Sequence, residues 1–241
     1  MKILGFNSGH DVAYCLLDNG IPVIHEELER FIREKEPLGD GLEMALERLP
    51  KETLDDVTHF AFGNPRKRTG DHKLTCAKQH AEDSMNVLLD KSNGEYYVIS
   101  HHQSHAANAF FSSNYDEALI ITIDGSGFAG GTIMAMASVG EPKYWLDFYN
   151  AFLAGGGGPS THTYAVVDKL KPIAERSEQD RFDVAASLQR ATEEVAYNII
   201  KPYIEKYTPT NICFSGGVIL NSVMMGKMYD WFGVENMYVC P

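Results

Sequence analysis

The sequence lacks the features that would mark it as a disulfide-rich, zinc-knuckle or membrane protein. It has only four cysteines in 241 residues, and no two of them form a C-x-x-C pair, which argues against a disulfide framework or a zinc knuckle. No apolar run approaches the roughly 20 residues that cross a bilayer, and no export signal follows Met1. We therefore expect a cytoplasmic protein with no membrane partner.

Positive charge is also scarce. The chain has 21 Lys and Arg against 33 Asp and Glu, a formal net charge of −12. Proteins that dock on a nucleic-acid backbone need a positive face, so the charge disfavours this kind of binding but leaves room for a local basic groove. The basic clusters at 30–35 and 66–68 are more often solvated surface.

The opening residues have the pattern of an antiparallel meander. Asn19-Gly20 between apolar runs is a strong hairpin signal, and Pro22 favours an edge position for the strand that follows. The expected strands are 2–7, 12–17 and 21–25.

Strand-like and helical spacings alternate along the rest of the chain, which has an ordinary globular composition. Expected strands are 57–62, 96–99, 118–123, 132–138 and 211–214, and expected helices are 41–49, 74–89, 101–111, 183–201 and 218–229. Pro202 should end or kink the helix that precedes it. Residues 150–180 are the hardest to interpret, because the glycines at 155–158 fit neither a helix nor a strand interior.

Three strand–glycine turns recur, at Asn7–Gly9, Asp124–Gly127 and Ser215–Gly217. Glycine turns let backbone N–H groups approach phosphates, although one such turn alone is more often a plain turn. Three of them resemble the split nucleotide site of the actin-like ATPase superfamily. That resemblance implies an α/β fold of two related lobes, with mixed sheets flanked by helices.

Two histidines are spaced as metal ligands on a helix. His101 and His105 lie four residues apart, which places both imidazoles on one helical face. Alone, such a pair is as often a core or surface feature. Asp124, at the tip of an apolar strand, would complete an N/N/O ligand set suited to Fe²⁺, Mn²⁺ or Zn²⁺, and the metal would act as a Lewis acid.

Five segments together resemble one family. Residues 3–13, 29–35, 101–107, 123–127 and 215–221 read ILGFNSGHDVA, ERFIREK, HHQSHAA, IDGSG and SGGVILN. In this order they are similar to the motifs of the O-carbamoyltransferases that modify antibiotics and Nod factors, relatives of the tRNA threonylcarbamoyl-adenosine transferase subunit. The helix of residues 183–189 (DVAASLQ) is also similar.

The resemblance implies a two-step reaction. Carbamoyl phosphate and ATP give carbamoyl-adenylate, and the carbamoyl group then passes to an acceptor hydroxyl. His101, His105 and Asp124 would bind the metal. His10 or Asp11 would lie near the carbamoyl group as a candidate base, although either could simply cap its turn. The nucleotide would be held by Gly125, Ser126, Gly127, Gly216, Gly217 and Asn221.

The sequence departs from the family pattern in three ways. The metal-binding aspartate of the family's P-x-x-x-D-x-G motif would lie beyond Pro241, and no adenylate-forming domain is present. The region around 139–182 is shorter than in relatives. We expect a first lobe at 1–138, a shortened irregular connection at 139–182 and part of a second lobe at 183–241. Without a further domain or chain, the first step should not be completed and the metal should be held weakly.

Two alternatives remain open from the sequence: a kinase-like or regulatory ATP-binding module, and a catalytically silent partner subunit. The histidine pair argues against a kinase, because kinases of this superfamily bind Mg²⁺ through carboxylates and phosphates. The sequence does not identify the acceptor; the candidates are a sugar or other natural product and a hydroxymethylated nucleobase. A separate adenylate-forming domain or chain is an expected partner, and the sequence is compatible with a homodimer.

Overall fold

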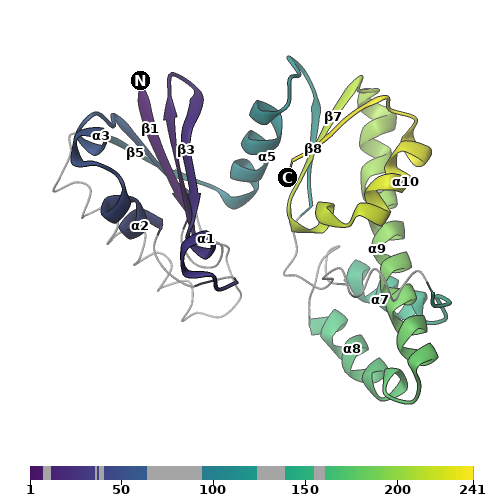
Figure 1. The fold of residues 1–241 in the computed structure, drawn as a ribbon. Helices are drawn as coiled ribbons and strands as arrows, with labels where there is room; N and C mark the ends of the chain where they lie inside the picture. The colour runs from purple at the N-terminus through teal and green to yellow at the C-terminus, as the bar shows by residue number, and fades with distance from the viewer. Residues whose placement is uncertain are drawn as a thin grey trace. The chain divides into compact units, whose positions relative to one another are not determined.

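The chain divides into two compact units, Met1–Ser104 and His105–Pro241. The computed structural model describes residues 1–7, 12–35, 37, 41–63, 94–123, 139–154 and 161–240 (Figure 1). Both units contain a sheet with helices packed on it, so the predicted α/β class is confirmed. The helix expected at 74–89 and the strand expected at 132–138 lie outside the described residues.

The first unit is built on a mixed five-stranded sheet. Its strands, in the order β3-β2-β1-β4-β5, are β1 (Lys2–Asn7), β2 (Ala13–Asp18), β3 (Ile21–Glu27), β4 (His59–Gly63) and β5 (Glu95–Ile99). β1, β2 and β3 pair antiparallel, and β4 and β5 extend the sheet in parallel. Asn19 and Gly20 take φ angles of 49° and 83°, as a tight hairpin requires. The meander and the edge position of β3 are therefore confirmed.

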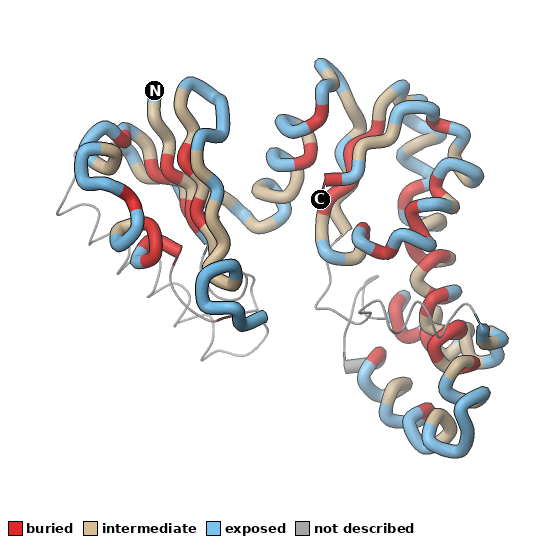
Figure 2. The backbone as a smooth tube through the Cα atoms, in the orientation of Figure 1, coloured by how far each residue is buried: buried red, intermediate tan, exposed pale blue. Residues whose placement is uncertain are grey.

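Alternating side chains of this sheet form the core of the first unit. Leu4 and Phe6 of β1, with equivalent residues of β2 and β4, are buried against Leu42 and Ala45 of the second helix (Figure 2). The period of two puts these residues on a single face of the sheet. The helices described between the strands of this sheet are α1 (Leu28–Ile32), α2 (Gly41–Arg48) and α3 (Lys51–Asp55).

The second unit contains a parallel three-stranded sheet in the order β6-β7-β8. The strands are β6 (Leu119–Thr122), β7 (Asn211–Ser215) and β8 (Asn236–Val239), and helix α5 spans His101–Ser112. Ile212 and Phe214 of β7 pack against α9 (Glu178–Tyr207) and α10 (Ser222–Phe232). Cys213 faces the opposite way, toward Ala109 of α5. The sheet is thus covered by helices on both faces.

Residues 145–154 and 161–174 are helical, so the expectation of an irregular connection is wrong for them. α7 (Trp145–Ala154) and α8 (Thr161–Ala174) pack on α9. Phe148 and Phe152 lie one turn apart and are both buried, while Leu170 packs beside them. The intervening glycine run had obscured this helical spacing.

α9 is longer than predicted at both ends. It begins after the N-cap Ser177, whose hydroxyl accepts from the Asp180 N–H, and continues five residues past Pro202. Pro202 therefore does not end the helix. The helix ends instead at Thr208, which takes the left-handed conformation with φ 41°. A proline so close to the C-terminal end removes one hydrogen bond that the packing of the helix offsets.

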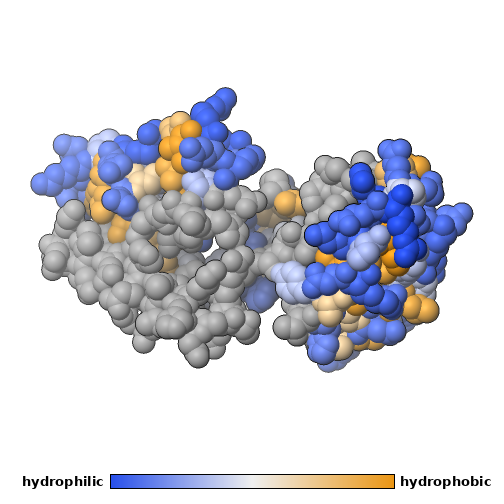
Figure 3. Space-filling model, turned by 90° about the horizontal axis from the view of Figure 1, so that it is seen from below, coloured by the Kyte–Doolittle hydropathy of each residue, from blue (hydrophilic) through white to orange (hydrophobic). Residues whose placement is uncertain are grey.

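The described surface seen in Figure 3 is mainly hydrophilic, with hydrophobic residues in small separate groups. Among the described residues, none of the helices combines the length and the apolar character needed to cross a bilayer.

Candidate functional site

The histidine segment forms the first turns of helix α5, as its spacing predicted. Ser100 precedes the helix, and its hydroxyl accepts from the Gln103 N–H at 3.3 Å and donates to the Gln103 side-chain oxygen at 2.8 Å. The bond from the Gln103 N–H caps the helix and fixes its start. His101 and His105 are half-buried, whereas His102 is exposed. The two histidines of the predicted metal pair thus differ in burial from the one between them.

His105 contacts the glycine turn that follows β7. Its Nδ1 lies 3.3 Å from the hydroxyl oxygen of Ser215, the last residue of the strand. Ser215 is 3% exposed and His105 is half-buried, so the contact is partly buried within the second unit. A hydrogen bond at one ring nitrogen of a histidine fixes the ring and directs the other nitrogen. His105 is consequently oriented by the strand that carries the predicted adenosine turn.

Only glycine suits position 216, the residue that directly follows β7. Gly216 has a φ of 106°, a region that L-residues with a side chain rarely adopt. Residues Gly217–Leu220 form one turn of 3₁₀ helix, and α10 begins at Ser222. The prediction of a continuous helix from Val218 was therefore wrong. Asn221 interrupts it, because its side chain accepts from the Met224 N–H at 3.1 Å and caps α10.

Asn221 is held within a buried polar network. Its amide N donates to the Gln189 side-chain oxygen at 2.8 Å, and the Gln189 amide N donates to the Asn221 side-chain oxygen at 3.2 Å. Gln189 also donates to Glu193 at 2.8 Å, and the Lys227 ammonium binds the other Glu193 oxygen at 2.5 Å. Both oxygen and nitrogen of the Asn221 amide are thus engaged inside the protein. Sequence patterns gave no signal for the role of Gln189, Glu193 and Lys227.

This network borders a cavity of about 660 Å³ between α9 and α10. Its lining includes Gly140, Pro142, Arg190, Glu193, Lys227 and Trp231. The Arg190 guanidinium stacks on the ring of Trp145, 4.7 Å from the ring centroid. The volume lies within the range of small-molecule sites, and the lining combines an aromatic ring with paired charges. An aromatic or heterocyclic ligand with polar groups would suit it.

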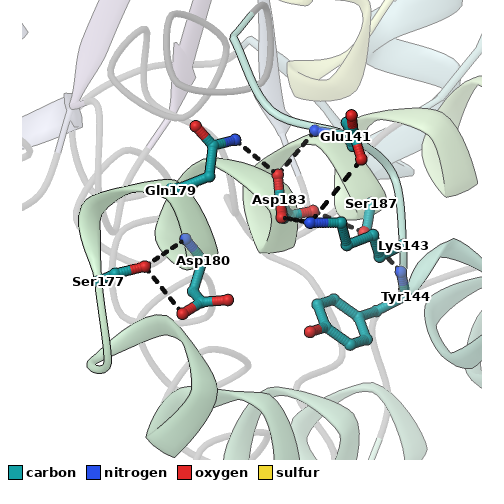
Figure 4. Close-up of polar contacts among 8 residues, drawn as sticks. All are labelled: Glu141, Lys143, Tyr144, Ser177, Gln179, Asp180, Asp183 and Ser187. Atoms are coloured by element: carbon teal, nitrogen blue, oxygen red, sulfur yellow. Dashed lines mark hydrogen bonds and ion pairs between the residues drawn. The ribbon is translucent and has the colours of Figure 1, made fainter.

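Asp183 is a buried carboxylate on α9, the helix that also carries the cavity-lining residues Gln189 and Glu193. Sequence reasoning did not single it out. It is 0% exposed. A hydrogen bond from the Lys143 ammonium, reinforced by the Glu141 N–H and the Gln179 amide, lowers its pKa to about 2 (Figure 4). The carboxylate is therefore charged in the folded protein at neutral pH. The sequence indicated a role for Asp183 only through its place in the DVAASLQ segment, which is similar to the family.

The other predicted site residues lie outside the described part of the chain: His10, Asp11, Asp124, Gly125, Ser126 and Gly127. Among the described residues, His, Cys, Asp and Glu side chains do not gather in a group of three or more able to hold a metal. The structure thus places two members of the predicted metal set, His101 and His105, one turn apart on α5. It leaves the third untested.

Comparison with known proteins confirms the resemblance to the O-carbamoyltransferase family. Residues 160–241 match the family model described as carbamoyltransferase N-terminus. Nodulation protein NolNO of Sinorhizobium fredii is 25% identical over an alignment 197 positions long, which covers 59% of this chain and 28% of that protein. Uncharacterized protein sll1178 of Synechocystis is 27% identical over an alignment 333 positions long, which covers 99% of this chain and 54% of that protein.

The chain therefore spans between about a quarter and about half of the length of these relatives. Among solved structures, the ROK hexokinase of Thermus thermophilus aligns with 99% of this chain and 93% of its own, at 13% identity and a TM-score of 0.45. A likeness at this level says nothing about activity.

Proposed function

Because the chain is related to the carbamoyltransferases, we propose that it moves a carbamoyl group from carbamoyl phosphate, through carbamoyl-adenylate, to an acceptor hydroxyl. One observation carries this proposal within the structure. The Ser215 hydroxyl, at the carboxyl end of β7, joins His105 of the predicted metal pair to the glycine turn predicted to bind the nucleotide. Ligands of α/β folds bind at the carboxyl ends of parallel strands.

The nucleotide would be bound at the turn and in the neighbouring cavity. At Gly216 the backbone adopts φ 106°, and a turn without a side chain can approach phosphate oxygens closely. The cavity between α9 and α10 offers Trp231 and Arg190 to the nucleoside part. Asn221 would act indirectly, since its amide caps α10 and binds Gln189. Gly125, Ser126 and Gly127 would complete the phosphate contacts.

The donor set fits a divalent metal such as Fe²⁺ or Mn²⁺, or Zn²⁺. His101 and His105 are one helical turn apart on α5, and the contact of the His105 Nδ1 with Ser215 leaves Nε2 as the coordinating atom. Asp124 would be the third ligand. Bound there, the metal would polarise a phosphate or carbonyl oxygen. His10 or Asp11 would accept the proton of the acceptor hydroxyl.

Mass spectrometry of candidate acceptors tests the proposal. The chain would be incubated with carbamoyl phosphate, ATP, Mn²⁺ and a separately supplied adenylate-forming domain, because the chain spans only part of its relatives. Sugars, sugar-containing natural products and hydroxymethylated nucleobases form the acceptor panel. We expect one acceptor to gain a single carbamoyl group, and His105→Ala to abolish the gain. Product formation that is unchanged in His105→Ala would contradict the proposed metal site, and no product on any acceptor would contradict the reaction.

A further inference from the structure

The segment of residues 139–144 is fastened to α9 by a buried carboxylate. Asp183 accepts from the Glu141 N–H at 2.8 Å and from the Lys143 ammonium, and it also accepts from the Gln179 amide at 2.9 Å (Figure 4). The Asp183 side chain is fully buried, while that of Lys143 is about half exposed. A buried carboxylate without such partners would be strongly unfavourable. The segment and Asp183 therefore stabilise each other.

A second contact fixes the end of the same segment. The Tyr144 N–H donates to the Ser187 hydroxyl at 2.9 Å, and that hydroxyl donates to the Asp183 backbone oxygen at 2.6 Å. Ser187 lies one turn after Asp183 and is fully buried. The segment is thus held at two successive turns of α9.

The start of the segment touches the α9 backbone directly. A Cβ atom at Gly140 would collide with the carbonyl oxygen of Phe182 and would lie 2.7 Å from the backbone nitrogen of Asp183. Only a residue without a side chain allows this approach. The segment therefore contacts α9 at both of its ends, at Gly140 and at Tyr144.

The residues of the segment alternate in what they contact. Gly140 and Pro142 line the cavity between α9 and α10, whereas Glu141 and Lys143 bind Asp183. Neither Asp183 nor Lys143 is among the residues that line the cavity. The contacts with Asp183 consequently fix the position of one wall of the cavity. Asp183 and Lys143 themselves would not contact a ligand bound in it.

We propose that Asp183 and Lys143 are positioning residues, which hold the 139–144 segment as a wall of the α9/α10 cavity and thereby set the affinity of the cavity for the nucleoside part of ATP. The inference rests on the proposed function for the identity of the ligand. The position of the wall itself does not depend on that function.

The two tryptophans of the chain report on this arrangement directly. The sequence contains only Trp145 and Trp231. Trp231 lines the cavity, and Trp145 directly follows the segment and stacks on Arg190. Trp231→Phe leaves Trp145 as the single tryptophan, and this Trp145 reporter protein reports on the segment. Trp145→Phe leaves Trp231, and this Trp231 reporter protein reports on the cavity. Titration of the Trp231 reporter protein with ADP measures nucleotide binding in the cavity.

Lys143→Met is the principal test, because its half-exposed side chain should let the protein fold without the ammonium. In the Trp145 reporter protein we expect greater quenching by acrylamide, and faster hydrogen exchange of the Glu141 and Tyr144 amides. In the Trp231 reporter protein we expect ADP to bind about tenfold more weakly, the size expected from loss of one hydrogen bond between charged groups. Lys143→Arg should restore both readouts, and Asp183→Asn should reproduce the loss.

The matched control is Lys169→Met, which breaks the exposed Lys169–Asp147 pair in the same unit and should change neither readout. Unchanged exchange and quenching in Lys143→Met would overturn the positioning role. Disturbed exchange with unchanged ADP affinity would overturn the link to the ligand. If ADP fails to bind the unsubstituted chain, the proposed nucleotide site fails, while the exchange measurement still decides whether Lys143 positions the segment.

Discussion

Substitution of Asn221 by alanine separates a structural role of this residue from direct contact with a nucleotide. The change removes the N-cap of α10, which costs about 1 kcal/mol, because the Met224 N–H loses its acceptor. It also removes the donor to the Gln189 side-chain oxygen. An unsatisfied buried polar group costs about 1–3 kcal/mol. The bond that Gln189 keeps to Glu193 is donated by its nitrogen, so it does not replace the donor lost at the Gln189 oxygen. Together these losses predict a decrease of about 2–4 kcal/mol in the free energy of unfolding.

Urea denaturation followed by tryptophan fluorescence measures this decrease, since Trp145 and Trp231 both lie in the second unit. Asn221→Asp is the matched variant. Its carboxylate still caps α10 but cannot donate to Gln189, so we expect a loss between those of the alanine variant and the unsubstituted chain. In a double-mutant cycle with Gln189→Leu, the two residues should couple by about 1 kcal/mol. A decrease below about 0.5 kcal/mol in Asn221→Ala would refute the reasoning and would leave the amide available to a ligand.

Three further predictions concern the metal pair and the buried carboxylate. His105→Ala should lose Mn²⁺ or Zn²⁺ binding in equilibrium dialysis, with the exposed His102→Ala as a control that retains it; equal losses would contradict the assignment. Ser215→Ala should weaken metal affinity about 10-fold or more while Ser215→Thr keeps it, and unchanged affinity in the alanine variant would show that the hydroxyl does not orient His105. The pKa of Asp183 is lowered from 3.8 to about 2 by Lys143 and the Glu141 N–H, so its stabilisation is nearly complete above about pH 5 and is lost as the pH falls through 3.8 toward 2. Urea titrations across this range should show a smaller loss in Asp183→Asn, and an identical loss would contradict the contribution of Asp183.

Much of the local structure could be predicted because it depends on neighbours in the sequence. Asn19-Gly20 formed the expected hairpin, and Pro22 lies in the edge strand β3. Ser100 begins the helix that carries His101 and His105. In these cases turn geometry, a missing backbone donor and a capping hydroxyl act within a few residues.

Predictions failed where tertiary packing outweighed a local signal. α9 continues through Pro202 because the packing of its buried face outweighs one missing hydrogen bond. α7 and α8 form beside the glycine run at 155–158 because Phe148 and Leu170 bury their side chains against α9. Helix stability in proteins comes mainly from such burial rather than from propensity.

The sequence by itself determined the α/β class, the helical spacing of His101 and His105, and the glycine turn at Ser215–Gly217. Periodicity and conformational freedom are properties of short segments. Tertiary structure alone decided that His105 meets Ser215, that Gln189 pairs with Asn221, and that Asp183 holds the 139–144 segment. These contacts join residues 32 to 110 positions apart. They form because α5 and α9 pack on opposite faces of the sheet that contains β7, and the polar groups buried there must find partners.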